Sequence, residues 1–177
     1  MKKANRIRDR GSVEFRHEAD AKLERPGDFV LVLRGVLRSI VLRCPDDCGD
    51  ILTINLDSRA AKAWRFYRKH NQVSLFPSVW RDTGCRSHFI VWHHVIQWCD
   101  WGYDNDEILI DDEENIRRKI LEQSNDQWQH FSDIAEVIDA IPWDVNRSCG
   151  ALSNLGQMEA GEKELRGYFK LPAPREH

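Results

Sequence analysis

Two short cysteine-containing turns constrain the fold of this chain more than any other feature of its sequence. Cys44 and Cys48 flank a Pro-Asp-Asp turn, and Cys85 and His88 lie in a second turn that begins at Gly84. In each turn both side chains can point at one centre, and three thiolates with one imidazole form a tetrahedral ligand set that suits zinc. The spacing therefore predicts a Zn²⁺ site with four ligands: Cys44, Cys48, Cys85 and His88. The alternative is that these cysteines are buried thiols without a metal.

The composition is that of a soluble globular protein whose thiols stay reduced. Of the 177 residues, 41% are hydrophobic and 31% are charged. No apolar run approaches the roughly 18 residues that a membrane helix needs. The basic N-terminus, residues 1–11, is not followed by the apolar core of an export signal, so a cytoplasmic location is expected. Five cysteines in such a chain argue against a disulfide framework, because cytosolic thiols stay reduced and the number is odd.

The charge distribution predicts two domains. Residues 107–177 carry eight Lys and Arg against fifteen Asp and Glu, whereas residues 1–106 carry eighteen basic and fourteen acidic residues. The acidic stretch at residues 104–115 is a natural boundary between them. We therefore expect a domain at residues 1–103, an acidic linker at residues 104–110 and a second domain at residues 111–177.

The first domain is expected to be small and β-rich. Short apolar runs with β-branched residues are separated by turn signals such as Pro26-Gly27. One segment, residues 58–70, is predicted to be helical, since Ala60, Ala63, Trp64 and Tyr67 recur at helical spacing. His93 and His94 would lie on opposite faces of a strand.

The second domain is expected to be mostly helical, which makes the whole chain α+β. Helical periodicity covers residues 112–123, 130–141 and 142–158, and residues 163–172 can form two short strands. This order resembles a winged helix-turn-helix, with residues 144–155 as the recognition helix. The net negative charge favours a protein-docking role over DNA binding, which depends on phosphate neutralisation by Lys and Arg. A plain helical bundle is the alternative.

Residues 13–98 also resemble a known family, on motifs whose order and spacing agree. The family consists of small zinc-type domains encoded in bacterial operons together with ubiquitin-like proteins and their activating and conjugating enzymes. The chain departs from the family at Asp46, where a further cysteine is usual, and at Leu42 and Arg43, where His-Leu is usual. The matching pieces are Val13 to Phe15, Leu23 to Val32, Cys44 to Gly49, Ser74 to Val79, Cys85 to Phe89 and Trp98.

The resemblance implies a zinc-binding component of a bacterial ubiquitin-like modification pathway, with anti-phage defence as its setting. The first interpretation is a peptidase that processes or deconjugates the ubiquitin-like protein. An alternative is a non-catalytic, ligase-like adaptor, and a third is a zinc-containing transcriptional regulator. The expected partners are the ubiquitin-like protein and its activating or conjugating enzymes, without membrane or nucleic acid.

For a peptidase, the catalytic residues suggested by these motifs are Glu14, Ser87 and His88. Glu14 is the best candidate for the general base, although the sequence alone favours an exposed strand carboxylate at this position. Ser87 and Ser78 are nucleophiles or hydrogen-bond donors, and Ser87 can instead satisfy a thiolate. A ligand set of three cysteines and one histidine is closed, which favours a structural metal unless His88 is free to act as a base.

Overall fold

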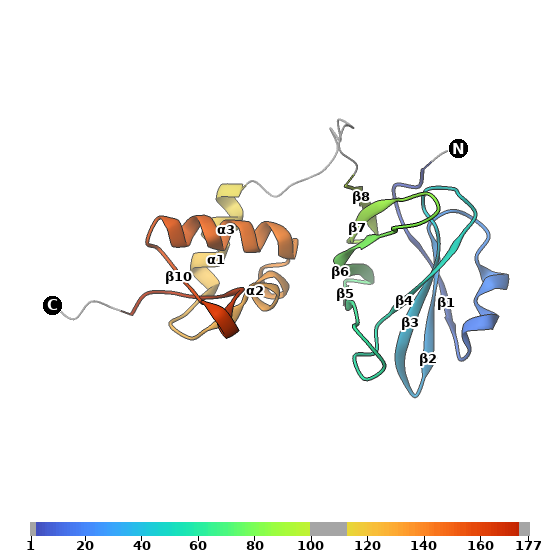
Figure 1. Cartoon of the computed structure of the whole chain (residues 1–177), viewed down its shortest axis with the longest axis horizontal. Coiled ribbons are helices and arrows are strands. Elements are labelled where there is room, and N and C mark those ends of the chain that lie inside the picture. Colours follow the sequence, from blue (N-terminus) through green and yellow to red (C-terminus); the bar gives the residue numbers. More distant parts are fainter. Residues whose placement is uncertain (1–2, 100–112, 174–177) are drawn as a thin grey trace. The chain divides into compact units, whose positions relative to one another are not determined.

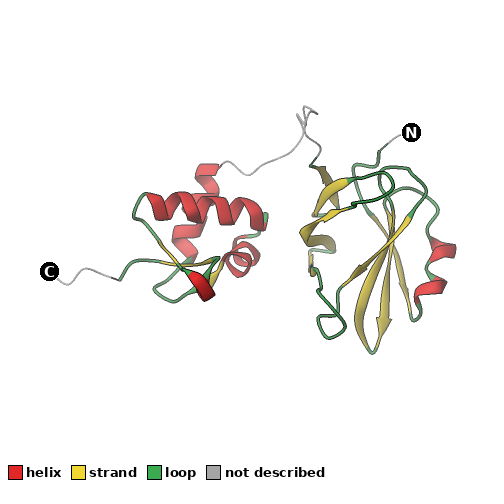
Figure 2. Cartoon of the chain, in the orientation of Figure 1, coloured by secondary structure: helices red, strands yellow, loops and turns green. Residues whose placement is uncertain are grey.

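The computed structural model describes residues 3–99 and 113–173 and divides into two compact units, Met1–Asp106 and Glu107–His177 (Figure 1). The predicted acidic linker, residues 104–110, lies outside the described residues. Strands dominate the first unit and helices the second (Figure 2). The α+β class, with N-terminal sheets and C-terminal helices, is confirmed.

Residues 3–99 of the first unit form two four-stranded sheets. In the first sheet, β1 runs parallel to β2 and the remaining neighbours are antiparallel. The second sheet is a meander in which each strand pairs with the next in antiparallel fashion. Two 3-10 turns, η1 (Arg16–Glu18) and η2 (Asp20–Lys22), connect β1 to β2. The strands are β1 (Arg8–Val13), β2 (Asp28–Arg34), β3 (Val36–Arg43), β4 (Ile51–Asn55), β5 (Arg65–Lys69), β6 (Gln72–Trp80), β7 (His88–Trp92) and β8 (Val95–Trp98).

Both sheets contribute to one hydrophobic core. Alternate residues of a strand point to opposite faces, so β2, β3, β6 and β7 each send alternating apolar side chains into this core. The second face of the first sheet is also covered, by a smaller cluster that includes Ala19 and Leu23 from the β1–β2 connection. The main core contains Phe29, Ile40, Leu42, Leu75, Phe89 and Val91.

The helix predicted at residues 58–70 is wrong, because Arg65–Lys69 forms strand β5. Only Phe66 of this strand packs against the core, and the following His70 and Asn71 both have positive φ. Two consecutive residues with positive φ form the tight hairpin turn that matches strand twist, here between β5 and β6. The placement of His93 and His94 within a strand is also wrong, since they form an equivalent turn between β7 and β8.

In the second unit, the described residues 113–173 form three α-helices that pack beside a three-stranded sheet in the order β10-β11-β9. Its buried apolar residues include Ile116 and Ile120 of α1, together with Val145, Cys149 and Leu152 of α3. The winged-helix assignment stays a prediction. The elements are α1 (Glu113–Gln123), β9 (Gln129–His130), α2 (Phe131–Ile138), α3 (Pro142–Asn154), β10 (Glu159–Ala160), η3 (Lys163–Leu165) and β11 (Tyr168–Lys170).

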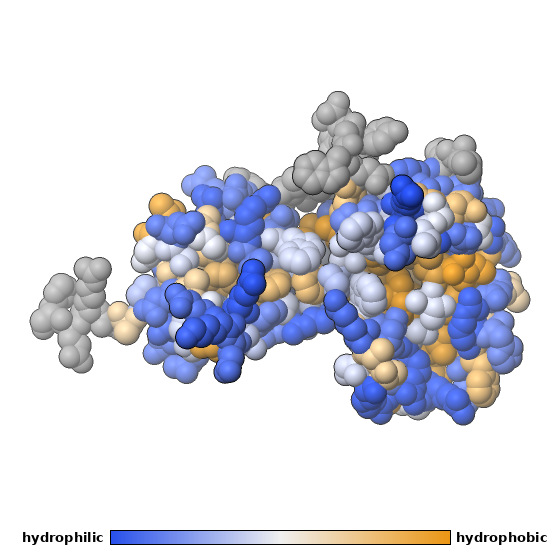
Figure 3. Space-filling view, viewed as in Figure 1, coloured by the Kyte–Doolittle hydropathy of each residue, from blue (hydrophilic) through white to orange (hydrophobic). Residues whose placement is uncertain are grey.

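The face of each unit visible in Figure 3 is predominantly polar. Hydrophilic side chains cover most of the visible face of each unit, with hydrophobic residues between them (Figure 3). None of the described helices is both long and apolar enough to cross a membrane.

Candidate active site and thiol cluster

The hairpin formed by β6 and β7 brings three polar or aromatic side chains to one face of the second sheet. Val79 pairs with Phe89 and both are buried in the core. Ser78 and Trp80 flank Val79, so they point away from the core. His88 is the direct cross-strand partner of Trp80. The outward face of this hairpin therefore carries Ser78, Trp80 and His88 side by side.

Ser78 and His88 are in hydrogen-bond contact. The distance between Nε2 of His88 and Oγ of Ser78 is 2.9 Å, and both residues are half-buried. When Nδ1 carries the ring proton, the serine hydroxyl donates to Nε2. Within the described residues, no carboxylate is hydrogen-bonded to Nδ1. A serine and a histidine in this contact form a nucleophile with an adjacent general base.

The loop before β5 also holds Ser78 in place. The indole Nε1 of Trp64 donates to the backbone carbonyl of Ser78 at 3.4 Å. The backbone N–H of Trp64 in turn donates to the carbonyl of Asn55 at the end of β4. This chain of contacts fixes Ser78 against the first sheet as well as against its own hairpin.

Three cysteines form a separate cluster. Cys44 follows β3, Cys48 precedes β4 and Cys85 lies in the β6–β7 connection, and their sulfur atoms all lie within 4.8 Å of one another. The Cys44 and Cys85 sulfur atoms are 3.6 Å apart. Zinc–sulfur bonds of about 2.3 Å in a tetrahedron place sulfur atoms about 3.8 Å apart, so the three thiols fit a metal ion. His88 is not part of this group.

Arg81 crosses the thiol cluster. Its Nη1 lies 3.0 Å from the sulfur of Cys85 and 3.3 Å from that of Cys48, while Nη2 donates to Oδ2 of Asp50 at 2.7 Å. A guanidinium at this position favours ionised thiols. The sequence analysis did not predict a role for Arg81. The one feature of the sequence that could have indicated it is the position of Arg81 just before the second cysteine turn.

Ser87 faces the thiols and not His88. Its side chain is buried, and its Oγ lies 3.3 Å from the sulfur of Cys85 and 3.8 Å from that of Cys44. This arrangement agrees with the alternative interpretation of Ser87, in which its hydroxyl forms a hydrogen bond with a cysteine sulfur. The structure therefore brings Ser78, and not Ser87, to His88.

The thiols of the cluster differ in their proton affinity. Burial raises the pKa of the Cys44 thiol to about 12. Burial acts in the same direction on Cys85, but hydrogen bonds from the side chain and backbone of Ser87 hold the pKa of the Cys85 thiol below its usual value. Cys85 thus ionises more readily than Cys44.

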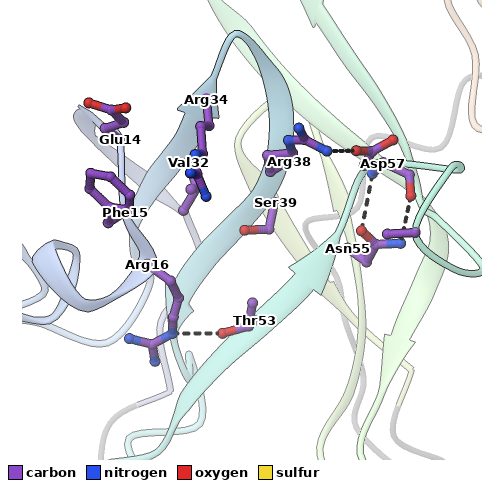
Figure 4. Close-up of a pocket in the computed structure, with 11 residues that line it drawn as sticks. Glu14, Phe15, Arg16, Val32, Arg34, Arg38, Ser39, Thr53, Asn55 and Asp57 are labelled. Atoms are coloured by element: carbon purple, nitrogen blue, oxygen red, sulfur yellow. Dashed lines mark hydrogen bonds and ion pairs between the residues drawn. The ribbon is translucent and has the colours of Figure 1, made fainter.

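Glu14 lies far from both groups. It is exposed and lines a cavity of about 530 Å³ on the first sheet, which Figure 4 shows with Asn55 and Asp57 on the opposite side. Val13, which precedes Glu14, pairs with Val32, and Val32 pairs with Ser39 of β3. Glu14 therefore lies near Ser39, whereas the cysteines lie beyond the end of β3 at Arg43. The stretch from Ser39 to Cys44 spans roughly 17 Å of extended strand. The structure does not bring Glu14 together with Ser87 or His88.

The first unit is similar to one family of known proteins. Residues 15–99 match the protein family described as bacterial ubiquitination-like system serine protease (BubE). The match covers nearly all of the described first unit, including Ser78, His88 and the three cysteines, and just under half of the chain. No curated protein matches the chain. No solved structure matches it either. The predicted resemblance to a family of bacterial ubiquitin-like operons is confirmed.

Proposed function

We propose that this chain, whose first unit matches a family of serine proteases from bacterial ubiquitination-like systems, is a serine-type peptidase with Ser78 as nucleophile and His88 as general base. The observation that carries this proposal is the 2.9 Å contact between Oγ of Ser78 and Nε2 of His88. The family description supports the reaction class, and the hairpin geometry supports the choice of serine.

The reaction follows from the chemistry of this pair. Ser78 Oγ attacks the carbonyl carbon of the scissile amide while His88 Nε2 accepts the hydroxyl proton. The C–N bond of the tetrahedral intermediate then breaks, and His88 gives that proton to the leaving amine. Water attacks the acyl-enzyme, with His88 again accepting a proton, and Ser78 leaves with that proton. The products are a carboxylate and a free amine.

The proposed substrate is a ubiquitin-like protein, either as a precursor with a C-terminal extension or joined to a target. The activating and conjugating enzymes of the same pathway are the further proposed partners. Both follow from the pathway in which the matched family is placed.

For the thiol cluster we propose a structural Zn²⁺ ion held by Cys44, Cys48 and Cys85. Soft thiolate ligands at these separations suit zinc, and Ser78 already occupies Nε2 of His88. The bound ion would supply a cross-link between the end of β3 and the connection that leads into β7.

For the second unit we propose a winged-helix-like docking module for a protein partner. Its order of one helix, a short strand, two helices and two short strands supports this proposal. Its net negative charge disfavours a DNA partner. An adaptor without chemistry of its own is the competing function, and it predicts that Ser78 is dispensable.

The test is cleavage of the ubiquitin-like precursor of the same operon by wild type, Ser78→Ala and His88→Ala, followed by mass spectrometry. We expect each variant to lose about 10³-fold or more in kcat/KM. Ser87→Ala is the matched control, which should remain active and still be acylated at Ser78 by a fluorophosphonate. Wild-type rates in Ser78→Ala would refute the nucleophile. A folded wild type that neither cleaves nor is acylated would refute the peptidase and favour the adaptor function.

A further inference from the structure

Trp80 is the most exposed of the large apolar side chains in the described residues, at 73%. It ends β6 directly opposite His88, and the two ring centroids are 5.8 Å apart. The exposed indole leaves in contact with water a large apolar surface that tryptophan residues usually bury. Its position beside the general base distinguishes it from an apolar residue scattered on the surface.

The position of His88 between Ser78 and Trp80 determines which part of a substrate meets the indole. His88 must pass its proton to the leaving amine, so the residue that carries this amine lies against the imidazole. Ser78 holds the acyl part of the substrate at the other side of the ring. The leaving residue therefore extends past His88 toward Trp80.

We infer that Trp80 forms the subsite for the leaving residue and favours an apolar side chain or methylene stem directly after the scissile bond. This inference rests on the proposed peptidase function. The flat indole supplies contact area without a charge, and contact of this kind discriminates between side chains by their apolar size. Trp80 is thus a specificity-determining residue, and Ser78 and His88 perform the chemistry.

The high exposure of Trp80 makes its substitution a test of binding and not of folding. The Trp80 side chain is not part of the core, so its removal should not disturb the fold. Trp64, by contrast, is half-buried and donates a hydrogen bond to the Ser78 carbonyl. Trp80→Phe retains an aromatic surface, whereas Trp80→Ala removes it. Leu155→Ala removes another exposed apolar side chain, 66% accessible and located at the end of α3, and is the matched control.

The experiment uses the full chain and three substrates built on the ubiquitin-like protein. Two carry a short C-terminal extension that begins with Leu or with Gly after the scissile bond, and the third is the ethyl ester, which has no leaving residue. We expect wild type to favour Leu over Gly by about tenfold in kcat/KM. Trp80→Ala should lose this preference yet hydrolyse the ester within about twofold of wild type, and Trp80→Phe and Leu155→Ala should keep the preference.

Two results would overturn the subsite. One is an unchanged preference for Leu in Trp80→Ala, and the other is an equal loss of rate on all three substrates. A wild type that fails to hydrolyse even the ethyl ester would instead refute the proposed function itself, and the subsite with it.

Discussion

Asp28 shows how one buried side chain fixes the edge of the first sheet. Its carboxylate is fully buried and accepts from Nε of Arg8 at 2.8 Å, with Nε of Arg10 at 3.2 Å. It also accepts from the backbone N–H groups of Glu24 and Arg25. These contacts join β1 and the loop before β2 to a single residue. Burial would raise the pKa of the Asp28 carboxyl, but these donors together hold it below its usual value.

Asp28→Asn is expected to lower the free energy of unfolding at pH 7 by about 2–3 kcal/mol, because it removes charge-assisted hydrogen bonds from a buried site. The folded-state pKa lies below the unfolded-state value of about 3.9, so this stability is present above that pH and is lost as pH falls through the folded-state pKa. Urea denaturation at pH 7 and pH 3 should show the difference from wild type shrinking at the lower pH. Asp20→Asn, an exposed control, should change little, and a pH-independent difference would contradict the assignment.

For the proposed catalytic serine, the sequence offered Ser87 and Ser78 and favoured Ser87, whereas the structure brings Ser78 to His88. Ser87 adjoins His88 in the chain, but strand alternation turns it toward the thiols. Ser78 approaches His88 from a diagonal position, because the register of β6 and β7 shifts between Leu75 and Val79 and places Trp80 directly opposite His88. Such an irregularity is set by tertiary packing, which a sequence pattern does not contain.

At the scale of elements, the thiol cluster brings together the end of β3 and the β6–β7 connection, which belong to different sheets. Cys44 extends from the first sheet, and Cys85 belongs to the connection between β6 and β7 of the second sheet. A metal ion bound to both would restrict the hairpin that carries Ser78 and His88. The two four-stranded sheets would then be joined by coordination as well as by the core.

Cys85→Ser is therefore expected to remove bound metal and to lower the unfolding temperature. An ion bound only by the folded state contributes about 2.7 kcal/mol when its free concentration is a hundred times Kd. Mass spectrometry of metal content and thermal denaturation, with and without a chelator, measure both effects. Cys99→Ser, outside the cluster, is the control and should retain the metal. Unchanged metal content and stability in Cys85→Ser would show that the site is not a metal centre.

The elements that were predicted poorly from the sequence are those that can be recognised only from the turn beside them. Most strands of the first unit coincide with the short apolar runs, and α1 to α3 follow the helical periodicity. β5 was missed because Ala60, Ala63 and Trp64 mimic one helix face, although they precede the strand. The turn at His93 and His94 carries neither Gly nor Asn, so only the pairing of β7 with β8 reveals it.

At the scale of the whole molecule, each unit contains its own hydrophobic core. The main core of the first unit draws on both of its sheets, and the buried residues of α1, α2 and α3 form the interior of the second. Separate cores allow separate cooperative unfolding. The division also assigns the proposed chemistry to the first unit and the proposed partner docking to the second.

Calorimetry of the full chain is therefore expected to show two unfolding transitions that respond to different substitutions. Ile120 is fully buried in α1, so Ile120→Ala should destabilise the second unit by about 2–5 kcal/mol through lost burial and a cavity. Only one transition should move, and the rate of precursor cleavage at 25 °C should stay at the wild-type value. Leu75→Ala, in the core of the first unit, should move the other transition. A shift of both transitions by either substitution would show that the units unfold as one, and docking and catalysis would then share a single folding equilibrium.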